Sequence, residues 1–243
     1  MREGVGEKVV WDNTPLLRGI ANLLFGISFV LVLYGVVRYV LRLPVFPLRA
    51  VELTAAPQRV SSEQLQKVVR EQVSGNFFTV DLESTRQAFE KLSWVRKVSV
   101  RRKFPWSIEV EVEEQVALAT WNSKELVNTH GEVFAGKVEQ VLPVFIGQPD
   151  TSAQVTQMFG EMNAALQPLH QQITQISLSP RFAWQVKLEN GMVLELGREE
   201  MHERLSRFVN VYPYSLAALA RPVRHVDLRY RNGFAAYVSG NNV

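Results

Sequence analysis

The sequence contains no cysteine among its 243 residues. It therefore forms no disulfide and offers neither a thiol nucleophile nor the thiolates that hold iron–sulfur clusters. A chain without thiols suits an oxidising compartment, where an unpaired cysteine could form an unwanted disulfide. An excess of one charge sign is also missing, since 27 basic and 24 acidic residues give a net charge of +3. That excess is too small to indicate a nucleic-acid-binding surface on its own.

Histidine is scarce, and familiar catalytic motifs are absent from the sequence. The four histidines have no metal-ligand spacing: His130, His170, His202 and His225. There is no G-x-S-x-G nucleophile motif, no Walker loop and no G-x-G-x-x-G dinucleotide motif. We therefore expect no catalytic, cofactor-binding or metal-binding residues, no small-molecule substrate and no enzymatic activity.

One long uncharged run stands out from this ordinary composition. Residues 19–37 carry no charge and are bracketed by Arg18 and Arg38. A helix of this length covers roughly the 30 Å hydrocarbon core of a bilayer. A signal peptide has a shorter apolar region, of about 7–15 residues. The run predicts a transmembrane helix over residues 19–40, preceded by a short tail of residues 1–18.

The flanking charges leave the orientation of this helix open. Three basic residues lie near each end, so the positive-inside comparison is a tie: Arg2, Lys8 and Arg18 precede the run, and Arg38, Arg42 and Arg49 follow it. The size of the C-terminal part favours a cytoplasmic tail and an exported body.

Small and polar residues mark one face of the expected membrane helix. Gly19, Asn22 and Gly26 are spaced at i, i+3 and i+7, and such residues permit close contact with another helix in lipid. The alternative is that glycine is simply tolerated in membrane helices.

The segment after the helix predicts a β-α-α-β-β domain over residues 44–115. Ser61 and Gln64 form a capping-box pattern, and Asp81 can cap a second helix. Residues 98–112 alternate between apolar and charged side chains, which is typical of a half-buried hairpin. Its basic strand faces an acidic one, so cross-strand pairing is favoured over phosphate binding. The expected core is Leu65, Val69, Phe89, Leu92, Val98, Ile108 and Val110.

The remainder, residues 116–243, predicts a β-rich domain with two helices, so the fold class is α+β. One helix is expected from about Thr151 to Leu166, and another after Gly197, ending near Pro213. Asn190-Gly191 and Asn232-Gly233 indicate tight hairpin turns, because both residues tolerate positive φ. The last strand, residues 234–238, is expected at a sheet edge.

Several motifs occur in an order that resembles the FtsQ/DivIB family of bacterial cell-division proteins. They are FPLRAV at 46–51, NFFTVDL at 76–82, WVRKVSVRRKFP at 94–105, LVNTHGEVF at 126–134, LPVFIG at 142–147, LGR at 196–198 and VDLRYRNGFA at 226–235. The chain lacks the longer tails usual in Gram-positive members, so it resembles the Gram-negative type. The resemblance implies that residues 44–115 form a POTRA domain and residues 116–243 an FtsQ-type β domain.

The resemblance also implies a function. Members are non-enzymatic single-pass proteins that scaffold the divisome and link early and late division proteins. The implied partners are FtsB and FtsL, with FtsK, FtsW and FtsI as further ones. The implied location is the inner membrane at the division septum, with type II topology and most of the chain in the periplasm.

The family's positions for binding FtsB fall near the C-terminus of this sequence. The matching residues are Arg198, Arg229, Tyr230, Asn232, Gly233 and Phe234, and strand addition would involve Ala235, Ala236 and Val238. Arg198 and Arg229 are expected to pair with acidic residues of FtsB. Alternatively, Leu228 and Tyr230 belong to a buried strand.

Two other classes of protein remain as alternatives. POTRA domains also occur in envelope transport and assembly proteins, which need a barrel of many alternating strands. An envelope wall hydrolase would need a carboxylate pair or a metal centre.

Overall fold

The computed structural model describes residues 14–43, 47–219 and 222–238. Its contacts divide the chain into two compact units, which are described separately below. The first comprises residues 1–89 and 98–112, and the second residues 90–97 and 113–243.

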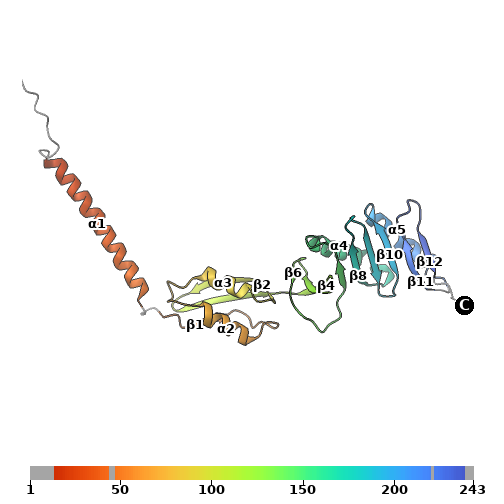
Figure 1. Cartoon of the computed structure of the whole chain (residues 1–243), viewed down its shortest axis with the longest axis horizontal. Helices are drawn as coiled ribbons and strands as arrows, with labels where there is room; N and C mark the ends of the chain where they lie inside the picture. Colours follow the sequence, from red (N-terminus) through yellow and green to blue (C-terminus); the bar gives the residue numbers. More distant parts are fainter. Residues whose placement is uncertain (1–13, 44–46, 220–221, 239–243) are drawn as a thin grey trace, which may run out of the picture. The chain divides into compact units, whose positions relative to one another are not determined.

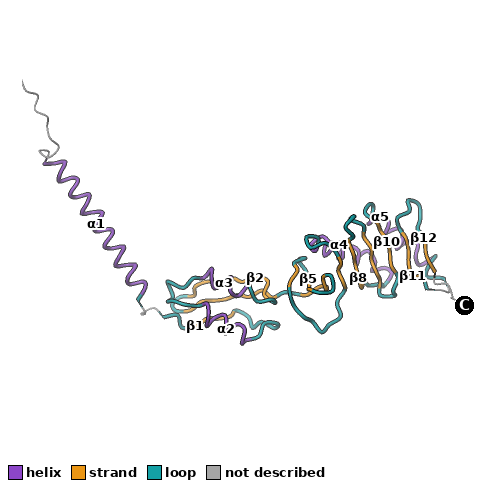
Figure 2. The backbone as a smooth tube through the Cα atoms, in the orientation of Figure 1, coloured by secondary structure: helices purple, strands orange, loops and turns teal. Residues whose placement is uncertain are grey.

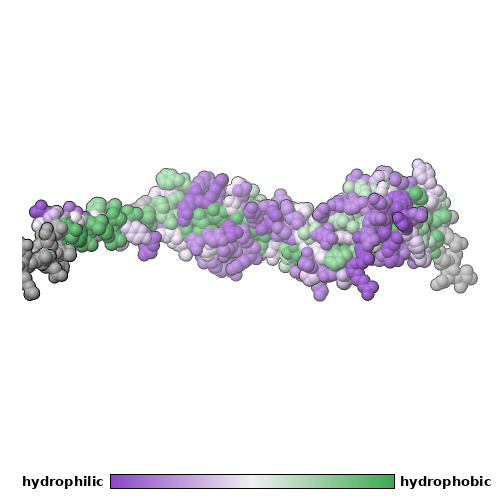
Figure 3. All heavy atoms as spheres, turned by 90° about the horizontal axis from the view of Figure 1, so that it is seen from above, coloured by the Kyte–Doolittle hydropathy of each residue, from purple (hydrophilic) through white to green (hydrophobic). Residues whose placement is uncertain are grey.

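Helix α1, Thr14–Arg42, contains the uncharged run and has 29 residues. At 1.5 Å per residue it is about 44 Å long, which exceeds the thickness of a bilayer core. None of its residues is buried against the rest of the described chain. Figure 3 shows its surface as an almost continuous run of hydrophobic side chains. Length and composition thus make α1 a candidate membrane span.

The β-α-α-β-β order predicted from the sequence is confirmed (Figures 1 and 2). Strand β1 pairs in parallel with β3, and β2 lies on the other side of β3. The bounds are β1 Ala50–Leu53, α2 Ser62–Gln72, α3 Leu82–Glu90, β2 Val95–Lys103 and β3 Ser107–Glu114.

Both predicted helix starts are present as capping interactions. The backbone N–H of Gln64 donates to the Ser61 hydroxyl over 3.2 Å, and the Ser61 N–H donates to the Gln64 side chain over 3.3 Å. Before α3, Asp81 Oδ1 accepts the backbone N–H groups of Glu83 and Ser84. These bonds satisfy donors that the first turn of a helix leaves unpaired.

The predicted core of this domain is largely correct. Five of its seven residues are buried: Leu65, Phe89, Val98, Ile108 and Val110. Val69 and Leu92 are only half-buried. Val69 is partly exposed because it lines an open groove between α2 and β1. The face of the hairpin that was expected to be apolar is the buried one.

The basic residues of β2 pair with acidic residues, as the charge pattern predicted. Arg101 contacts Glu109 at 2.7 Å, and Lys103 contacts Glu52 of β1 at 2.6 Å. The hydrogen bond from Arg101 lowers the pKa of Glu109, and the bond from Lys103 lowers the pKa of Glu52. These contacts compensate the charges of Arg101 and Lys103, while Lys97 and Arg102 of the same strand have no carboxylate partner among the described residues.

Arg96, at the start of β2, belongs to the second unit and forms ion pairs within it. Its guanidinium contacts Glu113 at 2.7 Å and Glu132 at 2.9 Å. The buried Asn128 donates to Glu132 over 2.6 Å, and together the Asn128 and Arg96 bonds lower the pKa of Glu132. Arg96 of the basic cluster therefore also holds the turn at residues 128–132. The sequence pattern gave no sign of this contact.

The second unit contains a nine-stranded sheet within the described residues. Its strand order is β12-β11-β10-β9-β8-β7-β4-β5-β6, so β12 and β6 lie at its edges. The helices are α4 Ser152–Leu166 and α5 Met201–Val211, and the strands are β4 Ala117–Trp121, β5 Glu125–Asn128, β6 Val133–Phe134, β7 Val144–Ile146, β8 Ile173–Leu178, β9 Trp184–Leu188, β10 Val193–Gly197, β11 Val223–Asp227 and β12 Ala235–Val238.

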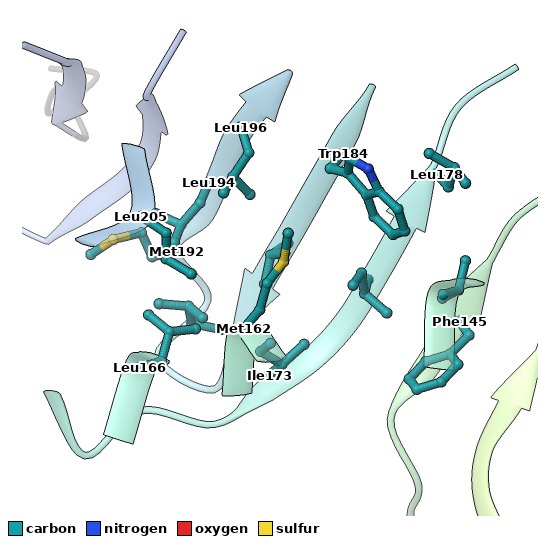
Figure 4. Packing of buried hydrophobic residues seen from close by; sticks show 14 of the residues in the cluster. Phe145, Met162, Leu166, Ile173, Leu178, Trp184, Met192, Leu194, Leu196 and Leu205 are labelled. Carbon is teal, nitrogen blue, oxygen red and sulfur yellow. The ribbon is translucent and has the colours of Figure 1, made fainter. Parts of the chain in front are cut away.

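One face of this sheet packs beneath α4 and α5. Met162 and Leu166 of α4 and Leu205 of α5 belong to the same buried cluster as Trp184 and Leu194 of the strands (Figure 4). Both helices occur where the sequence predicted them, within one or two residues. The apolar stripe of each helix faces the sheet, so the opposite face of the sheet stays accessible.

The hairpin predicted at Asn190-Gly191 is present, with β9 and β10 antiparallel on either side of it, but the turn predicted at Asn232-Gly233 differs from the structure. Gly191 has φ of +84°, but Asn190 is not in the positive region. Neither Asn232 nor Gly233 has positive φ among the described residues. Because Asp227 pairs with Ala235, seven residues, 228–234, separate the two strands. The prediction of a two-residue turn there is wrong, and a longer loop held by tertiary contacts replaces it.

We expect Ile108→Ala to lower the free energy of unfolding by about 2–5 kcal/mol, because the side chain is fully buried and its loss leaves a cavity. Denaturant unfolding of the purified protein measures this change. Glu111→Ala, at an exposed position of the same strand, should change stability by less than about 0.5 kcal/mol. Equal effects of the two substitutions would contradict the assigned faces.

Candidate functional site

Strand β12 lies at one edge of the nine-stranded sheet and pairs with β11 alone among the described strands. Its other edge therefore carries main-chain donors and acceptors that no neighbouring strand of the described chain satisfies. Such an edge is a ready template for another extended segment. The sequence-based expectation of an edge strand at residues 234–238 agrees with this topology.

Side chains of β12 alternate between the two faces of the sheet. Ala236 lies opposite the buried Val226, on the face covered by the helices. Tyr237 lies opposite His225 on the accessible face, with ring centroids 5.5 Å apart. The Tyr237 side chain is 60% exposed. A segment added to β12 would therefore meet an aromatic ring on one face and small residues on the other.

Contacts with α5 hold the loop that precedes β12. Arg207 donates through Nη1 to the Arg231 carbonyl over 2.8 Å and lies 3.4 Å from the Tyr230 carbonyl. The Phe234 ring packs edge-on against Phe208, with centroids 5.9 Å apart. The main chain of the loop is thus fixed from the helix side. Tyr230 remains 55% exposed, so its ring is available for contact.

Arg229 is engaged by Asp227 two residues earlier. Its Nε donates to Asp227 Oδ1 over 2.9 Å and its Nη2 to Oδ2 over 2.7 Å, and the Arg229 backbone N–H also reaches Oδ1 at 3.0 Å. The Arg229 side-chain bonds lower the pKa of the buried Asp227 carboxyl. The same bonds raise the pKa of Arg229.

Gly197 brings the two arginines of the expected site close together. Its φ is +77°, and a Cβ built there would lie 3.2 Å from Cγ of Arg229. The methylene stem of Arg229 therefore packs over Gly197, next to Arg198 in the chain. Arg198 is 70% exposed at its side chain and makes a 3.3 Å contact with its neighbour Glu199. A Cβ at position 197 would also lie 3.0 Å from Nη1 of Arg204, so both arginine side chains would have to shift by a few tenths of an ångström.

The structure therefore brings the expected site residues together at one end of the sheet. Their exposure to solvent differs. Arg198, Tyr230, Asn232 and Val238 are exposed, while Gly233, Phe234, Ala235 and Ala236 are half-buried.

Leu228 is buried and Tyr230 is exposed, so the alternative of a strand that buries both side chains is wrong. One detail differs from the sequence-based expectation. Arg229 was expected to pair with a carboxylate of a partner, yet two of its three donor groups already bind Asp227. The Nη1 group of Arg229 remains for that role, as do the two Nη groups of Arg198, whose Nε contacts Glu199.

Three contributors to this surface were missed. Tyr237 could have been found, since it alternates with Ala236 on the expected last strand. Arg207 and His225 gave no local signal, because their contacts join segments that are distant in sequence.

The open groove between β1 and α2, in the first unit, is the other candidate site. It has a volume of about 690 Å³ and is lined mainly by apolar side chains, with Ser62, Gln66 and Arg70 as its polar members. No Asp, Glu or His lines it. Across the described ranges, no three His, Cys, Asp or Glu side chains are grouped to hold a metal ion. The site at β12 is therefore the better candidate, and its features are those of a binding surface.

Comparison with known families gives two matches that together cover most of the chain. Residues 46–115 match the POTRA domain of FtsQ type, and residues 119–229 match the C-terminal domain of the cell-division proteins FtsQ and DivIB. The second match ends at Arg229, so β12 lies just beyond it.

Curated relatives named cell division protein FtsQ are similar along nearly their whole length. The protein of Nitrosospira multiformis is 40% identical over 232 residues, which are 93% of this chain and 98% of that protein. The protein of Bordetella pertussis is 36% identical and covers 93% of this chain and 92% of its own length. The protein of Burkholderia pseudomallei is 33% identical, with 95% of each chain covered.

We expect Asp227→Asn to lower stability at pH 7 by about 1 kcal/mol, because it removes a charged hydrogen-bond acceptor. The folded-state pKa of Asp227 is lowered, so its contribution is full above the unfolded pKa of about 3.8 and is lost as the pH falls through the folded value. Unfolding followed at pH 7 and at pH 3 should show a smaller acid-induced loss in the variant. Asp150→Asn, at an exposed carboxylate, is the control, and an identical pH response of both variants would contradict the assignment.

Proposed function

Because this chain belongs to the FtsQ/DivIB family of cell-division proteins, we propose that it is a non-catalytic scaffold of the divisome that binds FtsB and FtsL. Family membership places it in cell division and in association with a membrane. The more specific scaffold role is supported by the free edge of β12, which is flanked by the exposed Tyr230 and Arg198.

The proposed binding mode is the addition of a strand of FtsB to β12. Main-chain groups of the edge would supply affinity, and side chains on both sides would supply specificity. Tyr230 offers a rigid ring with a polar tip, and arginine offers a planar fork that fits carboxylates. Arg198 and the Nη1 group of Arg229 would then bind acidic side chains of FtsB. The contacts of Arg207 and Phe234 favour binding, because the loop is ordered before the partner arrives.

We propose the following topology for the chain. Residues 1–18 lie in the cytoplasm, residues 19–40 cross the inner membrane once, and the POTRA domain, 44–115, and β domain, 116–243, lie in the periplasm. The length and hydrophobic surface of α1 support the span. A periplasm-dependent reporter fused after Val243 should be active, and activity of a cytoplasm-dependent reporter instead would refute this orientation.

Concentration at the division septum and links to FtsK, FtsW and FtsI are part of the same proposal. They follow from the family's role of joining early ring components to late septal-wall synthesis.

We expect Tyr230→Ala to weaken binding of an FtsB fragment by at least about 2 kcal/mol, or roughly 30-fold, which is typical of aromatic side chains that become buried when a partner binds. Titration of the folded variant with the fragment measures the loss. Tyr214→Ala is the matched control, because that tyrosine is 89% exposed and lies outside the site. Unchanged affinity of the Tyr230 variant would contradict its role as an anchor.

Ala236→Pro should cause a similar loss of affinity. Proline removes a main-chain donor and constrains the backbone of the edge strand. Ala236→Ser keeps the donor and should bind FtsB normally. If the proline variant is folded and binds like the wild type, strand addition at β12 is wrong.

In the membrane, we propose that Gly19, Asn22 and Gly26 form the face of α1 that contacts partner helices. The structure supports this, since Asn22 and Gly26 line a shallow groove with Leu23, Ile27, Val30 and Leu31. Gly26→Leu should fill the groove and reduce co-purification of FtsL and FtsB without preventing membrane insertion. Gly35→Leu lies on the opposite side of the helix and serves as the control. Equal co-purification in both variants would refute the contact face.

A further inference from the structure

Exposed aromatic rings gather at the end of the POTRA domain where β2 turns into β3. Phe104, in this turn, is 84% exposed. Its ring lies 6.4 Å from Phe77, which in turn packs edge-on against Phe78 at 5.2 Å. Phe78 is 42% exposed. Clustered exposed apolar rings are unusual on a water-facing surface and indicate an interaction site.

Two arginines at the same end are not paired with acidic groups. Arg49 lies over the ring of Trp106, with its guanidinium carbon 5.7 Å from the ring centre. Arg102 donates to the carbonyl oxygens of Phe77 and Val80, each over 2.9 Å. Neither arginine contacts a carboxylate in the described part of the chain. The cluster therefore combines apolar rings with uncompensated positive charge.

The path of the chain shows what lies next to this end of the domain. The Arg49 N–H donates to the Trp106 carbonyl over 2.9 Å, and Ala50 lies opposite Ser107. The segment that leaves α1 thus enters the domain beside the turn that carries Phe104. Pro47 also bridges to Asn76, which adjoins Phe77.

The connection to α1 is too short to let this end move far away. Four residue steps separate Leu43 from Pro47, and a fully extended chain covers at most about 14 Å in that number of steps. The limit comes from chain length alone and holds for any orientation of the domain. If α1 spans the membrane, the aromatic cluster stays within reach of the headgroup layer.

We propose that this end of the POTRA domain, formed by Phe78, Phe104, Trp106, Arg49 and Arg102, docks on the membrane that α1 crosses. The rings would lie at the level of the lipid headgroups, where amphipathic and aromatic side chains are favoured. The two guanidinium groups would bind lipid phosphates. This inference rests on the proposed membrane span of α1. Its consequence is a restricted tilt of the domain over the membrane.

The absence of cysteine allows a direct test with single-cysteine probes. The full chain is reconstituted in vesicles of phosphatidylethanolamine and phosphatidylglycerol, and Phe104→Cys is labelled with the apolar fluorophore bimane. Quenching by lipids that carry a nitroxide near the headgroup then reports contact with the interface. Phe78→Cys gives a second probe position, should the change at the turn disturb folding.

Lys97→Cys is the matched control. It lies exposed on the same strand, seven residues from Phe104, or about 23 Å along β2. We expect the probes at positions 104 and 78 to be quenched at least threefold more than the probe at 97. Arg49→Gln should reduce this difference. Equal quenching at positions 104, 78 and 97 would overturn membrane docking.

A probe at Ile27→Cys, in the middle of α1, separates this inference from the proposed span. Quenching of that probe by a nitroxide deep in the acyl chains shows that α1 is inserted, whether or not the domain docks. An inserted α1 without interfacial quenching at position 104 or 78 refutes docking alone. An unquenched Ile27 probe refutes the membrane span, and docking with it.

Discussion

A strand at the edge of a sheet carries main-chain N–H and C=O groups on one side that only another chain or water can satisfy. In this protein β12 has that position, and β11 is its only partner among the described strands. Proteins usually protect such edges with charge, bulges or covering segments. Here the edge is short and lies beside exposed tyrosine and arginine side chains, which suits specific binding better than general protection. The proposed scaffold function depends on this arrangement.

The surroundings of the edge are held in place from within. Asp227 fixes Arg229 through two side-chain bonds, and Arg207 of α5 fixes the loop through main-chain carbonyls. The methylene stem of Arg229 packs over Gly197, whose φ of +77° would strain a residue with a side chain. A surface ordered in this way loses little conformational entropy when a partner binds. The same bonds occupy part of Arg229, so Arg198 is the more accessible cation for an acidic partner.

Local signals in the sequence were sufficient for most of the fold. The capping pair of Ser61 and Gln64 acts over three residues, and the alternation around Ile108 reports directly which face of the hairpin is buried. The loop before β12 could not be derived in this way. Asn232-Gly233 permits a tight turn, but the bonds from Arg207 come from a helix more than twenty residues away in sequence and favour a longer loop. The pairing of Arg229 with Asp227 was missed for a related reason. It forms because β11 ends at Asp227 and the chain turns there, and the sequence pattern did not give that end point.

Hydrogen–deuterium exchange of the β12 amides, measured with and without an FtsB fragment, tests the central claim most directly. Strand addition would place new acceptors opposite those N–H groups of residues 235–238 that point away from β11, which belong to alternate residues of the strand. Those amides should then exchange at least tenfold more slowly in the complex, while amides of β6, at the opposite edge of the sheet, should be unaffected. Unchanged exchange in β12 under conditions where the fragment is bound would contradict the account.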